Sequence, residues 1–253
     1  WRLAPFWPVA FVVLAILLSF TFTLQHECTH DTPFQTRWLN SAVGFLTGVI
    51  LFQPFLWFRY FHLAHHRHTN DPGHDPELDG DGKPETWRDF IWHLSTVPYW
   101  SAKVSVLWQN AFSQEFAHYI PTAARPKIQR EARFMLMIYT AAAVALWFEP
   151  KVTIIWLLPL AAGFPFLRLY LLAEHGRCAF IANMFENTRT TFTNRVIRFI
   201  AWNMPYHTEH HVFPNVPFHS LPALHRLMAQ HLQVTSNGYT DFTRAYVSGF
   251  KSR

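Results

Sequence analysis

The sequence predicts an all-α integral membrane protein. Half of its 253 residues are hydrophobic and only 15% are charged, whereas soluble domains carry about 25% charged residues. It also contains several uncharged stretches, and about 20 apolar residues suffice to cross a bilayer as a helix. A mean hydropathy of only +0.03 indicates that substantial polar segments alternate with these stretches. Part of the protein is therefore expected to lie in water.

Charge and cysteine content exclude several classes of protein. The net charge of +5 favours an anionic membrane face or an acidic partner, and the lack of a compact basic stripe argues against a nucleic-acid partner. Cys28 and Cys178 are the only cysteines, too few for a disulfide framework, an iron–sulfur cluster or a Cys-rich zinc site. Histidine is unusually frequent, with 16 copies in the chain.

The first expected span covers residues 3–25 and ends at the motif HECTH. A signal peptide is the alternative, but the run has no long basic segment before it and no small-residue cleavage site after it. The chain opens inside an apolar run, which is compatible with a missing upstream segment. Residues 38–58 form a second uncharged run, interrupted by Gly44, Gly48 and Pro54, and we expect this run to be interfacial or re-entrant.

The first part of the expected water-exposed cap covers residues 59–130. It contains a loop rich in Asp, Gly and Pro at 67–88 and an interfacial helix at 90–108. Residues 134–148 and 152–172 follow as a transmembrane hairpin, separated only by a short turn around Pro150. The second part of the cap covers residues 174–253. We expect the whole chain, 1–253, to form one domain.

Three histidine clusters carry the chemistry: His26 and His30 in HECTH, His62, His65 and His66 in HLAHH, and His207, His210 and His211 in HTEHH. Residues i, i+3 and i+4 lie on one helical face, so each cluster presents its imidazoles together. Chance clustering explains one such group, but not two groups of identical spacing together with an i, i+4 pair. Eight imidazoles exceed the three protein ligands of a catalytic zinc, so two metal ions are implied. Spacing cannot choose among iron, copper and zinc.

Topology allows the clusters to converge, because the hairpin returns the chain to the side on which the first span ends. This requires that residues 38–58 do not cross the membrane. The loops on the histidine side carry most of the Arg and Lys residues, so the positive-inside rule predicts a metal site that faces the cytoplasm. The predicted fold is thus a helical membrane protein with a cytosolic histidine-box cap that holds a di-metal site.

HECTH, HLAHH and HTEHH, with a membrane hairpin between the second and third, resemble the histidine boxes of the membrane fatty-acid desaturase and hydroxylase family. The resemblance covers about residues 10 to 215 and implies two non-haem iron ions with O2 as co-substrate. WNMPYHTEHH and FHLAHHRHTNDP are similar to bacterial members that include oxygenases of small molecules. The family also implies a ninth histidine ligand shortly before the third box, which His175 in LLAEHG matches, although Leu171 stands where some desaturases have a ligating Asn.

Several charged residues are candidates to support the metal ligands. A metal-bound imidazole normally donates its other N–H to a carboxylate or a carbonyl, and the candidate carboxylates are Glu27, Asp71, Glu174 and Glu209. Arg168 shares a helical face with His175, and a charge inside a span is either functional or reaches for the membrane surface.

The expected function is O2-dependent, di-iron C–H activation in a lipid or fatty-acyl substrate, leading to desaturation. Hydroxylation or oxidative demethylation of a small organic molecule by the same site is the alternative. An external electron donor is implied, a ferredoxin with its reductase or a cytochrome, because the chain has no dinucleotide, iron–sulfur or haem motif. A zinc protease with Glu27 as base would leave seven histidines unused. A metal transporter would place its site nearer the bilayer midplane.

Overall fold

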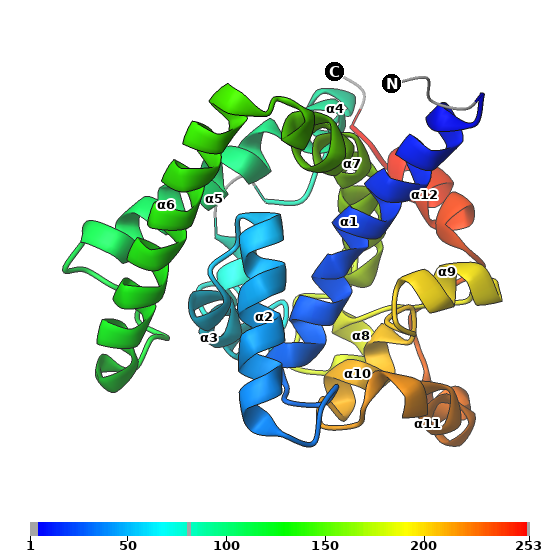
Figure 1. The fold of residues 1–253 in the computed structure, drawn as a ribbon. Coiled ribbons are helices and arrows are strands. Elements are labelled where there is room, and N and C mark those ends of the chain that lie inside the picture. Colours follow the sequence, from blue (N-terminus) through cyan, green and yellow to red (C-terminus); the bar gives the residue numbers. More distant parts are fainter. Residues whose placement is uncertain (1–4, 80–81, 252–253) are drawn as a thin grey trace.

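The computed structural model describes residues 5–79 and 82–251, and regular structure in this part is almost entirely helical (Figure 1). This confirms the all-α fold class. The first seven α-helices are α1 (Trp7–Thr29), α2 (Arg37–Leu51), α3 (Phe55–His68), α4 (Trp87–Leu94), α5 (Val97–Phe112), α6 (Arg125–Phe148) and α7 (Leu158–His175). The last five are α8 (Met184–Asn187), α9 (Arg195–Ile200), α10 (His207–Val212), α11 (Leu221–Met228) and α12 (Tyr239–Ser248).

Short elements connect these helices. They are the 3-10 turns Pro76–Leu78, Thr122–Ala124, Phe218–Ser220 and Ala229–His231, and a π-helical turn at Thr153–Leu157 that leads into α7. The two-residue strands β1 (Thr190–Thr191) and β2 (Thr235–Ser236) pair in parallel, with Thr190 opposite Thr235. This pairing ties the segment before α10 to the segment before α12.

Three helical stretches within the described residues are long and apolar enough to cross a membrane: Trp7–Thr29, Thr122–Phe148 and Thr153–His175. The second begins earlier than expected, because the basic segment at 125–133 forms the first turns of α6 instead of a loop. The third includes the π-helical turn at its start. The hairpin between α6 and α7 lies at the end of the molecule opposite to α10 (Figure 1).

The helices α1 and α7 pack along each other and carry histidines at their C-terminal ends. Gly163 permits the close approach, since a Cβ atom there would lie 2.0 Å from the carbonyl oxygen of Ala15 and 2.2 Å from Oγ of Ser19. The hydroxyl of Ser19 donates to the carbonyl of Ala15 in its own helix, at 2.9 Å. Contact between these two helices therefore sets how far His26 lies from His175.

A sharp bend separates α2 from α3, whose axes differ by 99°. Phe52 takes a left-handed conformation with φ 57°, and Gln53 and Pro54 follow it. Gln25 of α1 fastens the bend, because its Nε2 donates to the Gln53 carbonyl at 2.9 Å and its Oε1 accepts from Gln53 Nε2 at 3.0 Å. The bend gives residues 38–58 a shape suited to a re-entrant segment, and their placement in a bilayer stays a prediction.

The expected single helix at 90–108 is two helices, α4 and α5. Thr96 has a φ of 62°, a left-handed conformation that ends the first helix before Val97 begins the second. The break lets the start of α5 pack on α7, where the rings of Tyr99 and Trp100 lie 4.8 and 4.4 Å from that of Phe164. As a result, Lys103 of α5 lies near Trp57 of α3, and Tyr99 of α5 lies near Arg168 of α7.

Candidate metal centre

Four helices bring the predicted histidines together in two neighbouring groups. In the first group, the ligand nitrogens lie within 4.8 Å of one another, and the members are His26, His30, His62, His66 and His210. In the second group, His65, His175 and His211 meet the same criterion. His207 joins the second group, because its Nε2 lies 3.1 Å from Nε2 of both His175 and His211.

Helical geometry explains how the two later boxes divide. Successive residues turn by about 100°, so residues i and i+4 point almost the same way while i+3 points to the other side of that direction. In α3, His62 and His66 accordingly enter the first group and His65 enters the second. In α10 the assignment is reversed, since His207 and His211 join the second group and His210 the first.

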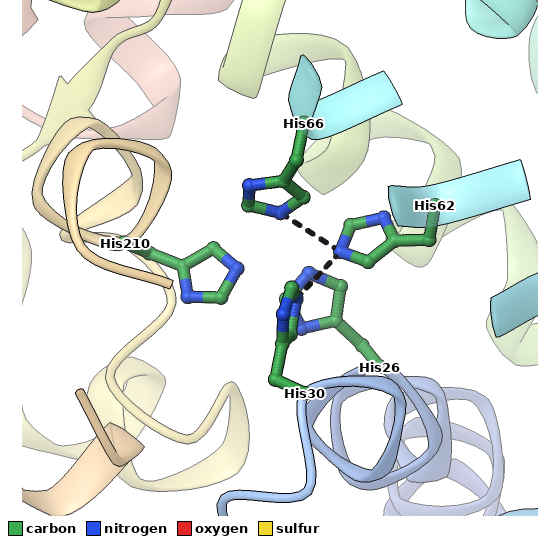
Figure 2. Close-up of side chains that lie close together, drawn as sticks. All are labelled: His26, His30, His62, His66 and His210. Atoms are coloured by element: carbon green, nitrogen blue, oxygen red, sulfur yellow. Dashed lines mark hydrogen bonds between the residues drawn. The ribbon is translucent and has the colours of Figure 1, made fainter. Parts of the chain in front are cut away.

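Ring nitrogens of the first group converge on a common centre (Figure 2). Nε2 of His62 lies 3.0 Å from Nε2 of His30 and 3.0 Å from Nε2 of His66. Two nitrogens bound at right angles, each about 2.1 Å from one ion, would be about 3.0 Å apart. His26 and His210 are 4% and 0% exposed, and neither ring nitrogen of either residue has a hydrogen-bond partner in the described part of the protein. Buried polar atoms are rarely left without partners, and a metal ion would supply one.

In the second group, the Nδ1 side of each of three rings is already occupied. His65 Nδ1 lies 2.9 Å from Asp75 Oδ1, and His175 Nδ1 donates to the Asn187 carbonyl at 3.0 Å. His211 Nδ1 donates to Oγ1 of Thr69 at 3.0 Å, because that hydroxyl gives its own proton to the His65 carbonyl. With Nδ1 protonated, a neutral imidazole has its lone pair on Nε2.

These lone pairs face one another. Nε2 of His65 lies 3.2 Å from Nε2 of His175, and both rings have their Nδ1 protons committed elsewhere. Two acceptors at that distance repel each other unless a cation lies between or beside them. The donor set of this group therefore fits a metal ion.

Burial keeps the imidazoles of His30 and of the three histidines in HTEHH neutral. Burial, followed by the nearby Arg59 charge, lowers the pKa of His30 to about 3. Burial, followed by neighbouring histidines, lowers the pKa of His207, His210 and His211 well below the usual value. Neutral imidazole is the form that binds metals.

The sequence matches the family model for fatty acid desaturases over residues 4–243. The chain belongs to the fatty acid desaturase family. Together with its three apolar helices, this membership indicates a membrane protein. The resemblance drawn from the three histidine boxes is thereby confirmed.

Relatives within this desaturase family match different portions of the chain. A sphingolipid delta(4)-desaturase of Bos taurus is 25% identical over 243 residues, covering 91% of this chain and 68% of the relative. An sn-1 oleoyl-lipid 12-desaturase of Anabaena variabilis is 24% identical over 246 residues, covering 88% of this chain and 55% of the relative. A fatty acid conjugase of Calendula officinalis is 35% identical over 69 residues, which cover 27% of this chain and 18% of the conjugase.

Two of the predicted supporting carboxylates lie beside the two histidine groups. Glu27 Oε2 accepts from Oγ1 of Thr32 at 2.8 Å and from the backbone N–H of Phe218 at 3.1 Å. Its Oε1 lies 3.8 Å from Nδ1 of His26 and 3.9 Å from Nδ1 of His210. Glu174 Oε1 lies 3.5 Å from Nδ1 of His207.

Asp71 does not contact a histidine of the three boxes. Asp75 of the same loop makes the carboxylate contact that was expected of Asp71. Asp71 Oδ2 lies 3.0 Å from Nδ1 of His74, at an exposed turn. Asp75 is 1% exposed and holds His65. Both aspartates stand in the same loop, and only the turn that begins at Asn70, with φ 56°, decides which one faces inward.

Glu209 and Arg168 also have partners outside the nine histidines. The carboxylate of Glu209 accepts from Oγ1 of Thr190 at 2.6 Å and pairs with Nδ1 of His225. Arg168 Nη2 donates to Nδ1 of His93 at 2.8 Å. Thr69 and Asn187, which hold His211 and His175, carried no signal in the sequence, because one contacts through a hydroxyl and the other through a backbone carbonyl.

Proposed function

We propose that this protein is a membrane-bound, O2-dependent di-iron oxidoreductase that desaturates a lipid or fatty-acyl substrate. The observation that carries the proposal is the pair of histidine groups whose Nε2 atoms lie 3.0 to 3.2 Å apart. Membership of the fatty acid desaturase family supports the reaction class. The relatives that span most of this chain are named for desaturation of sphingolipid and oleoyl-lipid substrates, which supports a lipid over a small molecule.

The nine histidines would hold the ions, five at the first and four at the second. When bound, iron would supply the redox chemistry by which O2, two external electrons and two protons, together with two hydrogen atoms taken from adjacent carbons, give an alkene and two molecules of water. The chain itself keeps most of these imidazoles neutral by burial and fixes which nitrogen of His65, His175 and His211 faces inward. Asp75 and the Asn187 carbonyl orient His65 and His175 and make their Nε2 atoms more basic. Glu27 Oε1 lies 3.8 and 3.9 Å from Nδ1 of His26 and His210, so it would act on these two ligands through packing and charge, without a direct hydrogen bond.

Electrons would come from a soluble or membrane-bound carrier, a ferredoxin with its reductase or a cytochrome. Lys127 and Arg130 at the start of α6 are exposed and suit docking to an acidic partner. Their neighbour Arg133 has a structural contact, because its Nε donates to the Ala111 carbonyl at 2.8 Å. If Lys127 and Arg130 dock the carrier, Lys127→Gln together with Arg130→Gln raises the KM for the carrier and leaves iron content unchanged.

Metal reconstitution tests the reaction class. The purified apo-protein is loaded with Fe(II) or Zn(II), and turnover of an acyl substrate is measured with an electron donor, in air and under argon. We expect two irons per chain and activity only with iron and O2, since zinc has no redox chemistry. Activity with zinc alone under argon would refute the oxygenase mechanism and favour hydrolysis.

Orientation in the membrane is part of the proposal, with the metal centre facing the cytoplasm. Pro72 and Glu149 are both exposed and lie in loops at opposite ends of the spans. The native Cys28 and Cys178 are buried, so background labelling is expected to be low. Pro72→Cys should be labelled by an impermeant maleimide only from the cytoplasmic side, and Glu149→Cys only from the other side. Labelling of Pro72→Cys from outside would reverse the assigned orientation.

A further inference from the structure

Two positive side chains, Lys103 of α5 and Arg168 of α7, lie against the same tyrosine ring. Lys103 Nζ is 4.9 Å from the centre of the Tyr99 ring, and Arg168 Cζ is 5.5 Å from it. The ammonium group also lies 5.0 Å from the ring of Trp57. Both cations are half-buried. Aromatic faces attract a cation only weakly, and this attraction does not replace a counter-ion for two neighbouring charges.

Neither cation has a carboxylate within 4 Å among residues 5–79 and 82–251. Glu77 acts on both at longer range, but its Oε2 lies 3.7 Å from Nδ1 of His65. Arg168 Nε is buried and has no hydrogen-bond partner. Charged groups inside proteins are normally paired, so two adjacent cations without an anion indicate a missing one.

His93 holds the guanidinium without neutralising it. Arginine can only donate, so the 2.8 Å contact from Arg168 Nη2 requires an unprotonated Nδ1 on His93. The other ring nitrogen, Nε2, donates to the Arg168 carbonyl at 3.4 Å. Burial, followed by the Arg168 charge, lowers the pKa of His93 to about 4, consistent with a neutral acceptor. Arg168 is thus oriented while its charge stays uncompensated.

The two cations lie next to the candidate metal centre. Lys103 Nζ is 6.0 Å from the ring of Phe58, and that ring stacks on His62 with centroids 5.5 Å apart. Arg168 stands two helical turns before His175 on α7. A substrate bound at these cations would have its carbon chain close to both histidine groups.

We propose that Lys103 and Arg168, which both lie against the Tyr99 ring, bind the negatively charged head group of the substrate while its carbon chain reaches the metal centre. The proposal rests on the proposed function and narrows the substrate class to amphiphiles that carry a carboxylate or a phosphate. The two head groups share the chemistry that the cations recognise, a compact anion with several acceptor oxygens.

Binding of chain-matched probes to the iron-loaded, full-length protein tests the proposal. The probes are decanoate, decyl phosphate and methyl decanoate, titrated calorimetrically in a neutral detergent. We expect Lys103→Met and Arg168→Gln each to weaken binding of the preferred anion by about 10- to 100-fold, the value of a charge-assisted hydrogen bond. Methyl decanoate should bind equally well to wild type and variants. Lys103→Arg should retain anion binding, and the exposed Lys151→Met and Arg244→Gln serve as matched controls.

A preference for decanoate or for decyl phosphate identifies the head group, and either result supports the site. Equal anion affinities in wild type and the Lys103 and Arg168 variants, or an equal loss for methyl decanoate, would overturn it.

Iron content and turnover of the methyl ester are measured on the same samples. If the protein binds two irons and oxidises the ester but shows no anion selectivity, only the proposed anion site is refuted. If the protein binds no iron, the proposed function is refuted. Thermal shift adds a folding control, because an anion that binds the native state should raise the Tm of wild type more than that of the variants.

Discussion

His65 Nδ1 lies 2.9 and 3.1 Å from the two carboxylate oxygens of Asp75. The carboxylate also accepts from the backbone N–H groups of Asn70 and Glu77, at 2.7 and 2.9 Å. It is therefore fixed from three sides and can hold the imidazole in one tautomer. We expect Asp75→Ala to lower iron affinity or activity by about 10- to 100-fold. Asp71→Ala, four residues away on an exposed turn, is the matched control and should match wild type in iron content.

Histidine substitutions should remove one metal position at a time. His62→Ala and His210→Ala change the first group, and His175→Ala changes the second, so each should lower bound iron and abolish turnover. Metal analysis and turnover are measured together. The controls are His68→Ala and His118→Ala, whose side chains lie outside both groups. Retention of both irons by His175→Ala would contradict its assignment as a ligand.

Glu27→Gln should reduce turnover without abolishing it. The wild-type carboxylate accepts from Thr32 and Phe218 and lies 3.8 and 3.9 Å from Nδ1 of His26 and His210, so it packs beside these ligands without a direct hydrogen bond. An amide keeps one acceptor oxygen, and loss of such a partner typically costs about 10- to 100-fold. O2-dependent activity is assayed with iron in excess. Complete loss of activity in a fully iron-loaded variant would instead give Glu27 a direct chemical role.

Gly163→Ala should disturb the metal centre from a distance. An added Cβ would lie 2.0 Å from the Ala15 carbonyl, so α1 must move away from α7. That movement separates His26 and His30 from His175 of α7, and we expect a lower Tm and less bound iron. Ala162→Leu, at the preceding exposed position, adds more volume without this clash. Equal losses in the two variants would mean that helix contact at Gly163 does not set the spacing.

Lys103→Met should stabilise the protein most at low pH. Burial, followed by Arg168, lowers the pKa of Lys103 from 10.5 to about 7. Between these values the unfolded chain binds more protons than the native chain, so wild-type stability rises with pH across this window. Below pH 7 both states are charged and the native state bears the full cost. The gain in Tm should therefore be largest below pH 7 and shrink toward pH 10, as measured by thermal unfolding without ligand. A gain that grows with pH would contradict the assigned shift.

Several features of the fold and the site follow from local sequence. Uncharged runs predicted the helices α1, α6 and α7. Charged residues are costly in lipid, so a membrane span appears in the sequence as a long run without them. The spacing of the boxes indicated that their imidazoles share helical faces. These properties depend only on neighbours within one or two turns, so a pattern in the chain suffices to predict them.

Only the tertiary structure decided how these parts combine. Box spacing is the same in HLAHH and HTEHH, yet the i, i+4 pair of the first belongs to one group and that of the second to the other, because α3 and α10 approach from different directions. The choice of Asp75 over Asp71 depends on one left-handed turn at Asn70. The meeting of Lys103 with Arg168 at Tyr99 depends on the break at Thr96 and on helix packing across the bundle. Such contacts join residues far apart in the chain, and no local periodicity records which distant surfaces will pack.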